Sequence, residues 1–533
     1  MLFEGQKSED TVPASIIDIT KEIQTSDDEQ NILLGGRSPF ITILDLAYKQ
    51  LLSFLITSVT LFLTPFMITK AIPNNEAALG ALAVAAPFEY LSQMFGWFIA
   101  VGGSATISYL VGQNNIEGAK LVLVQLIALS FIIAILLAVI LLPSLKSLLL
   151  LLIDATQGQL VLSLCYSYIV PFISGAIFVM LFFCVLAVFM GTGQMTMYMI
   201  LSAGQQILYI CILCPCFLFL TNLGIAGASL AFILSFIPSI IVGVIFLQKK
   251  GEINFDFKLL FKIRTFQYLK KVAGVGGIDL IASASGIIVL GTIQTLITKI
   301  ALRYAEQVPD NEKKSIYEQV LAAWGCLSKI YGVVVGLCYN TTGSYLTAAS
   351  YAIGAKRYAR FYQLTVLICV ITCVFILIIT LIVLGIAPYI AVIFSKLEFY
   401  VDLSTTIIRI FCITGLILPL QFIVTTFCQA ADYIVLGLIV AFITQILLLP
   451  VLFITIYFST KSLPVELNFI ISMTSFNIND VISGIISVIV MCISLKKFTG
   501  KHNITMTLKL AFAKTDLVDS LELNETEIST SQY

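Results

Sequence analysis

The chain has 533 residues, of which 59% are hydrophobic and only 11% are charged, with a mean hydropathy of +1.02. Soluble domains carry about 25% charged residues, so this composition excludes a soluble protein and predicts an integral membrane protein. The 30 basic residues balance the 30 acidic ones. Nucleic acids bind strongly basic surfaces, so we expect no nucleic acid partner.

Residues 1–38 are polar and acidic and lack an apolar segment after a basic start, so no cleavable signal peptide is expected. We expect disordered cytoplasmic tails at 1–38 and 498–533. A bilayer core of about 30 Å requires about 20 apolar residues per helix. By that measure the sequence predicts twelve transmembrane helices, near residues 50–71, 80–112, 119–142, 160–189, 195–219, 222–247, 270–300, 316–352, 361–392, 401–430, 434–459 and 466–495.

The long polar segment 248–267 divides these helices into two six-helix lobes, 39–247 and 268–497. Basic residues favour the cytoplasmic side of a membrane, and they are concentrated in this segment, in the loop after the eighth helix and after the twelfth helix. With an even number of helices, both termini are predicted to lie in the cytoplasm. We expect the plasma membrane as the location.

Two predicted helix ends resemble each other across the lobes. "SYLVGQNNIEG" (108–118) is followed 242 positions later by "SYAIGAKRYAR" (350–360). The shared positions are Ser108, Tyr109 and Gly112 in the first copy and Ser350, Tyr351 and Gly354 in the second. A parallel duplication of six-helix halves is a transporter architecture, with substrate bound between the halves near the middle of the membrane. The alternative is a chance similarity of two helix ends.

Small residues precede the first of these helix ends, in "VGGSATISYLVG" (101–112). Within lipid, small residues let helix backbones approach closely, so Gly102 and Gly103 predict a close helix contact. Gly112 and Gly354 are predicted to end their helices. Such contacts suit static packing and rocking helices equally well.

Four segments resemble the multidrug and toxic compound extrusion (MATE) transporter family, in the expected order. "AVGGSATISYLVGQNNIEGAK" (100–120) resembles its second-helix signature, and "GIAGASLAF" (224–232) its sixth-helix start. "SYAIGAKRYAR" resembles its loop after the eighth helix, and "IIRIFCITGLILPLQ" (407–421) its tenth-helix start. The resemblance covers roughly residues 38–497 and is to the proton-coupled bacterial-type, protozoan-like branch.

The resemblance implies an all-α membrane protein with twelve transmembrane helices in two pseudo-symmetric six-helix lobes. It also implies a secondary antiporter that exports organic cations, drugs or other xenobiotics in exchange for protons or sodium. Proton-coupled relatives carry an aspartate midway along the first helix, whereas "SVTLFLTPFMITK" (58–70) has no acid. Sodium-coupled relatives carry acids in the seventh and tenth helices, where this chain has Ser283, Ser285 and Gln421. The coupling ion therefore stays open.

Ionisable side chains inside membrane spans are costly and mark functional sites. Glu89 lies in the second predicted helix, at about the depth of the missing aspartate. A buried carboxyl that binds and releases a proton could exchange it for a cationic substrate, so Glu89 is a candidate coupling residue. The alternative is a structural glutamate that is hydrogen-bonded to a neighbouring helix.

Lys329 and Asp480 lie at similar depths in the second lobe, in the eighth and twelfth predicted helices. An ion pair would lower the cost of burying either charge, so we expect the two side chains to meet. Asp480 is then a second candidate coupling residue and Lys329 a cavity residue, although a purely structural pair is equally consistent. Asp279, near the start of the seventh helix, either reaches the membrane interface or has a function.

Aromatic faces attract organic cations, and aromatic and amide side chains complete the predicted substrate cavity. These candidates, each of which could instead serve helix packing, are Tyr90, Gln93, Tyr331, Asn340 and Gln421. The single histidine, His502, and twelve scattered cysteines provide neither a metal site nor a catalytic centre. We therefore expect no enzyme activity, no metal and no cofactor beyond the coupling ion, proton or sodium.

A flippase of the same broad superfamily, which moves a lipid-linked or amphipathic substrate, is the main alternative to an antiporter. Such flippases tend to line their cavity with several arginines, whereas Lys329 is the only deep basic residue here. A channel or a membrane enzyme would need pore charges or clustered reactive residues, which the sequence lacks. We expect a monomer whose partners are the lipid bilayer and a small amphipathic or cationic substrate.

Overall fold

A computed structural model describes residues 31–71, 75–152, 159–221, 223–250, 253, 267–309 and 313–502. Every regular element within these ranges is helical. The predicted tails, 1–38 and 498–533, and the predicted linker, 248–267, lie mostly outside the described residues. Only a few residues of each of these segments are therefore described.

The first lobe comprises the helices from residue 39 to residue 250. In chain order they are α2 (Pro39–Ala71), α3 (Asn75–Gly112), α4 (Ile116–Leu152), α5 (Gln159–Ser174), α6 (Ala176–Gly191), α7 (Met195–Leu208), η2 (Tyr209–Leu213), α8 (Cys214–Phe219) and α9 (Ile225–Lys250). Before them lies η1 (Asn31–Gly36), a single π-helical turn.

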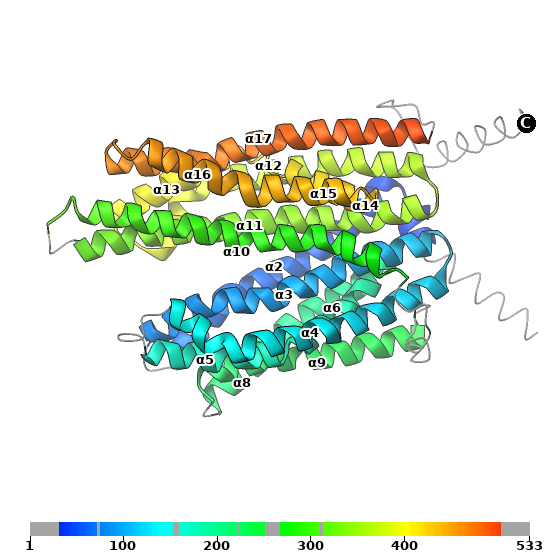
Figure 1. The fold of residues 1–533 in the computed structure, drawn as a ribbon, viewed down its shortest axis with the longest axis horizontal. Coiled ribbons are helices and arrows are strands. Elements are labelled where there is room, and N and C mark those ends of the chain that lie inside the picture. The colour runs from blue at the N-terminus through cyan, green and yellow to red at the C-terminus, as the bar shows by residue number, and fades with distance from the viewer. Residues whose placement is uncertain are drawn as a thin grey trace, which may run out of the picture.

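The second lobe comprises the helices from residue 269 to residue 501. They are α10 (Leu269–Ala305), α11 (Lys313–Gly354), α12 (Tyr358–Phe394), α13 (Glu398–Cys412), α14 (Leu420–Ala430), α15 (Ile434–Ala441), η4 (Phe442–Leu447), α16 (Leu448–Ser459) and α17 (Val465–Lys501). Figure 1 shows the two lobes as two halves of one elongated helical bundle.

The described helices account for twelve membrane spans, which confirms the predicted fold class. Ten spans are single segments long and apolar enough to cross a membrane, and α5 with α6, bent by 46°, forms an eleventh. The twelfth is α13 with α14, whose two pieces are short because residues 413–419 between them form turns. Pro419 lies at the end of that break and lacks the N–H that a continuous helix needs.

The first membrane helix begins at Pro39, and not near residue 50 as expected. Proline is favoured at the first helical position, and the preceding Ser38 hydroxyl accepts a hydrogen bond from the Ile41 amide at 3.5 Å. The start of this helix was missed because its first residues include charged side chains, which lower the local hydropathy. Asp45 forms ion pairs with two basic residues here, with Lys49 at 2.9 Å and with Arg37 at 3.4 Å.

Two edges of the predicted tails are ordered helix. Residues Asn31–Gly36 were placed in a disordered tail, yet they form η1, and Leu34 within it is fully buried. One apolar side chain in a polar segment is too weak a pattern to predict this turn. At the other end, α17 continues to Lys501, past the predicted lobe boundary at 497.

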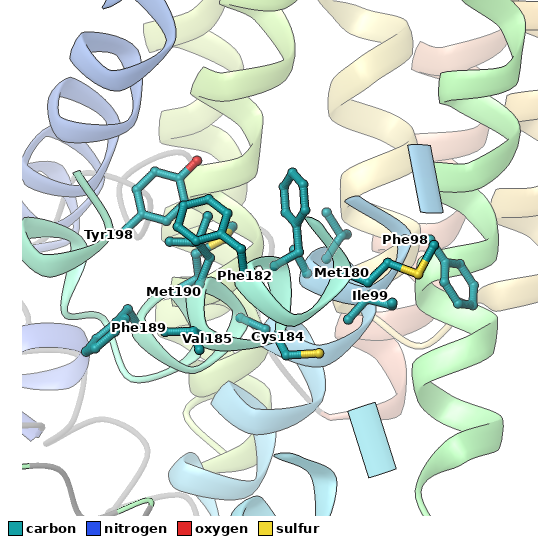
Figure 2. Close-up of a cluster of buried hydrophobic side chains, with 14 of the residues drawn as sticks. Phe98, Ile99, Met180, Phe182, Cys184, Val185, Phe189, Met190 and Tyr198 are labelled. Carbon is teal, nitrogen blue, oxygen red and sulfur yellow. The ribbon is translucent and has the colours of Figure 1, made fainter. Parts of the chain in front are cut away.

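The core of the first lobe is built around α6, which is buried along most of its length. Figure 2 shows its side chains from Met180 to Met190 packed among Phe98 and Ile99 of α3 and Tyr198 of α7. The helix carries no polar stripe, as expected for a span surrounded by other helices. It provides a rigid support for α3, which forms one side of the contact between the lobes.

The predicted repeat extends to backbone conformation, which argues against chance similarity. Asn114 and Lys356, 242 positions apart, both adopt left-handed conformations, with φ of 57° and 58°. The next residues donate equivalent hydrogen bonds, Asn115 N to Leu110 O at 2.9 Å and Arg357 N to Ala352 O at 2.8 Å. Both lobes also carry a π-helical turn in their fifth span, η2 and η4. The lobes are therefore two copies of one architecture.

Candidate functional site

The two lobes meet closely at the ends of α3 and α11, which we call the glycine end of the bundle. A Cβ atom on Gly112 would clash with the carbonyl oxygen of Tyr351, and one on Gly354 with the carbonyl oxygen of Tyr109. The contact is thus reciprocal between the repeat copies. Ser108 strengthens it by donating a hydrogen bond across the lobes to the carbonyl oxygen of Thr347 at 2.7 Å.

The adjacent glycines of α3 serve two different contacts. A Cβ on Gly102 would clash with the carbonyl oxygen of Val272 in α10, so Gly102 lies in the seam between the lobes. A Cβ on Gly103 would instead clash with Leu126 of α4 and approach Ala187 of α6, inside the first lobe. The structure therefore places all four predicted packing glycines in close contacts, three between lobes and one within a lobe.

Toward the opposite end of the bundle, the seam between the lobes becomes exposed. On α3, Phe98 packs against Gly276 of α10 and is 9% exposed, whereas Tyr90, which lies against Ser283 of α10, is 41% exposed. On α11, Gly336 packs against Phe54 of α2, whereas Lys329, seven residues earlier on the same face, is exposed. The lobes are thus closed at the glycine end and more open at the other.

Glu89 lies on α3 inside the first lobe and is partly buried. Its Oε2 accepts a hydrogen bond from the hydroxyl of Tyr168 in α5 at 3.4 Å. Tyr168 is itself 3% exposed and packs on Phe172. The carboxyl therefore has one neutral donor, and its contact with a neighbouring helix fits both the coupling role and the structural role.

Asp480 lies in the interior of the second lobe and is 4% exposed. Its Oδ2 accepts a hydrogen bond at 2.6 Å from Thr414, which belongs to the break between α13 and α14. Its Oδ1 accepts a long hydrogen bond, 3.5 Å, from the side-chain nitrogen Nδ2 of Asn479. The broken tenth span thus provides the main polar contact of this carboxyl.

The predicted pairing of Lys329 with Asp480 is wrong. Asp480 is buried and its two carboxylate oxygens lie against Thr414 and Asn479, whereas Lys329 is exposed. The face of α11 that points to α17 carries Trp324 and Tyr331, whose rings both pack on Phe476. Residues two apart on a helix do not face the same way, so Lys329 points elsewhere, toward the seam and α2.

Asp279 was expected at the membrane interface or in a functional role, and it is 2% exposed within the second lobe. Its Oδ1 accepts a hydrogen bond from the hydroxyl of Tyr339 in α11. The carboxyl borders a small pocket with room for about one water molecule. The pocket is lined by Ile278, Asp279, Ala282, Tyr339, Phe422, Thr425, Thr426, Gln429 and Gln445, from α10, α11, α14 and η4.

Polar atoms without hydrogen-bond partners gather at this pocket. They include Oδ2 of Asp279 and both polar atoms of the Gln445 amide, which is 8% exposed. Buried polar atoms are normally satisfied, so their convergence indicates a place for a small polar guest. Carboxylate, hydroxyl and amide oxygens are the ligands that hard cations prefer. The pocket is far too small for a drug-sized substrate.

Sequence reasoning missed most of this pocket. Tyr339, Thr425 and Gln445 were not singled out, because nothing local distinguishes them from packing residues. Tyr339 also packs edge-on against Trp97 of the first lobe, with ring centroids 6.0 Å apart. The polar groups beside Asp279 are therefore in contact with the seam between the lobes.

The remaining predicted cavity residues are buried or partly buried. The Asn340 amide donates to the carbonyl oxygen of Gly336 at 2.8 Å, within its own helix. Gln421, at the start of α14, is 4% exposed, and its Oε1 has no hydrogen-bond partner. Gln93 is partly buried on α3. Of the predicted set, Tyr90 and Lys329 are the two exposed residues.

A family model described as MatE matches residues 51–215 and 315–454, which together make up more than half of the chain. The two matched segments lie in the two lobes. With this match, the duplicated twelve-span fold and the seam between lobes, the protein belongs to the MatE family of transporters. This match confirms the family that the sequence motifs resemble. No match is found among curated proteins.

Solved structures of similar fold include a MOP superfamily transporter from Pyrococcus furiosus Vc1 (DSM3638), described as having a binding pocket of reverse polarity. It has a TM-score of 0.76 and 16% identity, and the match covers 88% of this chain and 98% of that one. An outward-facing multidrug resistance MATE transporter has a TM-score of 0.75 and 16% identity over 88% and 98% of the chains. A MATE complex with MaL6 has a TM-score of 0.74 and 17% identity over 88% and 99%.

Proposed function

We propose that this transporter is a secondary antiporter that exports organic cations and other amphipathic compounds in exchange for protons or sodium. It works by alternating access, as a monomer, because the seam lies between two lobes of one chain. The glycine end carries Lys356, Arg357 and Arg360. Basic loops favour the cytoplasm, so this end faces the cytoplasm of a plasma membrane protein and the opposite end faces outward.

The observation that carries this proposal is a set of three carboxyls inside the helix bundle, Glu89, Asp279 and Asp480. Each accepts a hydrogen bond from a single hydroxyl, and none belongs to an ion pair among the described residues. Removing a carboxylate from water without a counter-charge costs several kcal/mol. Such a group is stable when it holds a proton or a small cation, and intramembrane carboxyls of this kind are typical of ion-coupled transporters.

Asp279 has the best geometry for exchange with a substrate between the lobes. Its free oxygen faces a pocket of about one water's size, and its bound oxygen is held by Tyr339, which contacts Trp97 across the seam. Glu89 and Asp480 lie in separate interiors, one in each lobe. A cation bound at Asp279 is close enough to the seam for its release to depend on the position of the lobes.

The experiment is uptake of a fluorescent organic cation, ethidium, into proteoliposomes that hold an imposed pH or sodium gradient. The parent protein is expected to concentrate ethidium under one of the two gradients and not without a gradient. Asp279→Asn, Glu89→Gln and Asp480→Asn are compared with Asp402→Asn, which neutralises an exposed carboxyl on α13.

We expect Asp402→Asn to transport as the parent does. We expect at least one of the Asp279, Glu89 and Asp480 variants to lose gradient-driven uptake while it still exchanges ethidium down its own gradient. Full gradient-driven uptake by all three variants would remove the buried carboxyls from the mechanism. A parent that moves ethidium equally well without any gradient would remove the antiport itself.

A further inference from the structure

The η1 turn lies across the seam at the glycine end and contacts both lobes. On the first-lobe side, Leu34 is fully buried, and a Cβ added to Gly193, in the turn between α6 and α7, would be 2.8 Å from the Leu34 side chain. Leu34 also belongs to the large buried cluster that includes α6 and runs on into the second lobe. Its side chain is thus inserted into the first lobe beside the turn.

On the second-lobe side, two arginines hold the backbone of the same turn. Arg357 Nη1 donates to the carbonyl oxygen of Gly35 at 3.1 Å, and Arg360 Nη2 donates to the carbonyl oxygen of Leu34 at 2.8 Å. Hydrogen bonds from a charged donor are stronger than neutral ones. A Cβ on Gly35 would lie 3.0 Å from the Arg357 side chain and the Tyr351 ring, so the turn fits against α11 without spare room.

Arg360 also joins the lobes directly. The same Nη2 atom donates to Oγ1 of Thr42 on α2 at 3.2 Å, and Arg360 is 1% exposed. The turn, α2 and α12 therefore share one buried guanidinium. Tyr351, which contacts Gly35, is also the residue whose carbonyl oxygen touches Gly112, so the turn lies beside the interlobe glycine contact.

These contacts set a condition on alternating access. If the lobes part at the glycine end, Leu34 must leave the first lobe or the carbonyl groups of residues 34 and 35 must leave the arginines. Both cannot be kept, because the turn is a single short segment that is held by both lobes. These contacts are therefore complete only in the state that is closed at the glycine end. Their free energy shifts the equilibrium between the closed and open states toward the closed state.

We propose that residues 31–36 are a latch that holds the lobes closed at the glycine end and sets how often the seam opens there. The proposal rests on the proposed function, since a latch regulates a transporter whose lobes part in each cycle. In this proposal, a segment outside the twelve spans controls the equilibrium between the open and closed states. Weakening the latch increases the population open at the glycine end, and leaves the cation and substrate sites unchanged.

The test measures opening directly, so that it does not depend on transport. Ser108→Cys places a thiol at a fully buried position between the lobes. The protein in lipid nanodiscs is treated with a water-soluble maleimide, and labelling of the peptide that contains residue 108 is followed by mass spectrometry, which separates it from the native cysteines. The background carries Ser108→Cys alone.

Leu34→Asp is then compared with Gly36→Asp, which adds the same charge to the same turn at an exposed position. We expect Leu34→Asp to raise the labelling rate at residue 108 about tenfold, equivalent to about 1.4 kcal/mol, and Gly36→Asp to leave it unchanged. Arg357→Gln, which removes one hydrogen bond to the turn, is expected to raise the rate by a smaller factor.

Arg357→Gln also keeps the proposal testable if Leu34→Asp does not fold. Labelling rates equal to the background in every folded variant would overturn the latch. Ethidium transport is measured on the same samples. If the variants label faster but the parent shows no ion-coupled transport, the latch is supported and the antiport is rejected. If the parent shows ion-coupled transport but the variants label no faster, the antiport is supported and the latch is rejected.

Discussion

Gly354→Ala is the smallest change that tests whether the glycine contact closes one end of the transporter. The new Cβ would clash with the carbonyl oxygen of Tyr109, and neither backbone can move aside as a flexible side chain would. Overpacking of a tight site costs about 1–3 kcal/mol. Since Gly354 and Tyr109 lie in different lobes, that cost applies to the closed state and disappears when the lobes part.

A differential of about 1–3 kcal/mol changes an equilibrium by about 5- to 150-fold. We therefore expect Gly354→Ala, made in the Ser108→Cys background, to raise maleimide labelling at residue 108 by a factor in that range. The matched control is Gly332→Ala on the same helix, where an added Cβ meets nothing within 4 Å. Both substitutions make a helical residue less flexible, so their difference isolates the interlobe clash. Equal labelling in the two variants would refute the reasoning.

Three other contacts give further predictions. Gly103→Leu would clash with Leu126 and crowd Ala187, so we expect its thermal unfolding in detergent to begin at lower temperature, whereas Gly204→Leu, where an added Cβ meets nothing within 4 Å, should be close to the parent. When Lys329→Met and Asp480→Asn are combined, we expect their losses of stability to add within about 0.5 kcal/mol. When Asp480→Asn is combined with Thr414→Val, we expect the losses to be strongly non-additive, because these two side chains are hydrogen-bonded. Coupling in the first pair and not in the second would contradict the structure. His502 stacks on Tyr358 at the end of α17, with ring centroids 3.6 Å apart, and burial together with the nearby Lys501 lowers its pKa below 6.5. The folded state then binds fewer protons at this site than the unfolded state, so its contribution to stability is present above pH 6.5 and declines as the pH falls below it; NMR titration of this single histidine checks the direction, and a pKa above 6.5 would contradict it.

The duplicated fold could be predicted from sequence because it produces patterns within short segments of the chain. Apolar runs fix the spans, and the match of Ser108, Tyr109 and Gly112 with the positions 242 residues later extends to the backbone of the following turn. Turn conformation depends on a few neighbouring residues. A repeat of the local sequence is therefore a repeat of the local structure.

The faces of the helices could not be predicted in the same way. Depth in the membrane follows from counting residues, and by depth Lys329 and Asp480 are neighbours. Whether two side chains meet depends on helix rotation, which is set by packing such as that of Tyr331 on Phe476. For long spans that are apolar on most sides, the pattern of residues carries little information about rotation.

The pocket at Asp279 illustrates a second limit. Its polar residues come from four elements, and Asp279 and Gln445 are separated by more than 160 positions. Each of them, read alone, resembles a residue at a helix end or a packing residue. The sequence shows the carboxyl of Asp279, but it does not show which distant residues lie beside that carboxyl in the folded chain. Those neighbours distinguish a pocket from a membrane interface.

The central claim is that substrate and a monovalent cation move in opposite directions through the same protein. It is tested most directly by loading proteoliposomes with ethidium in the absence of any ion gradient and then diluting them. We predict that ethidium efflux drives protons or sodium inward, seen with a pH-sensitive dye or with radioactive sodium, and that this inward movement is lost in the combined Glu89→Gln, Asp279→Asn and Asp480→Asn variant. Ethidium efflux without any inward movement of either cation would contradict the account.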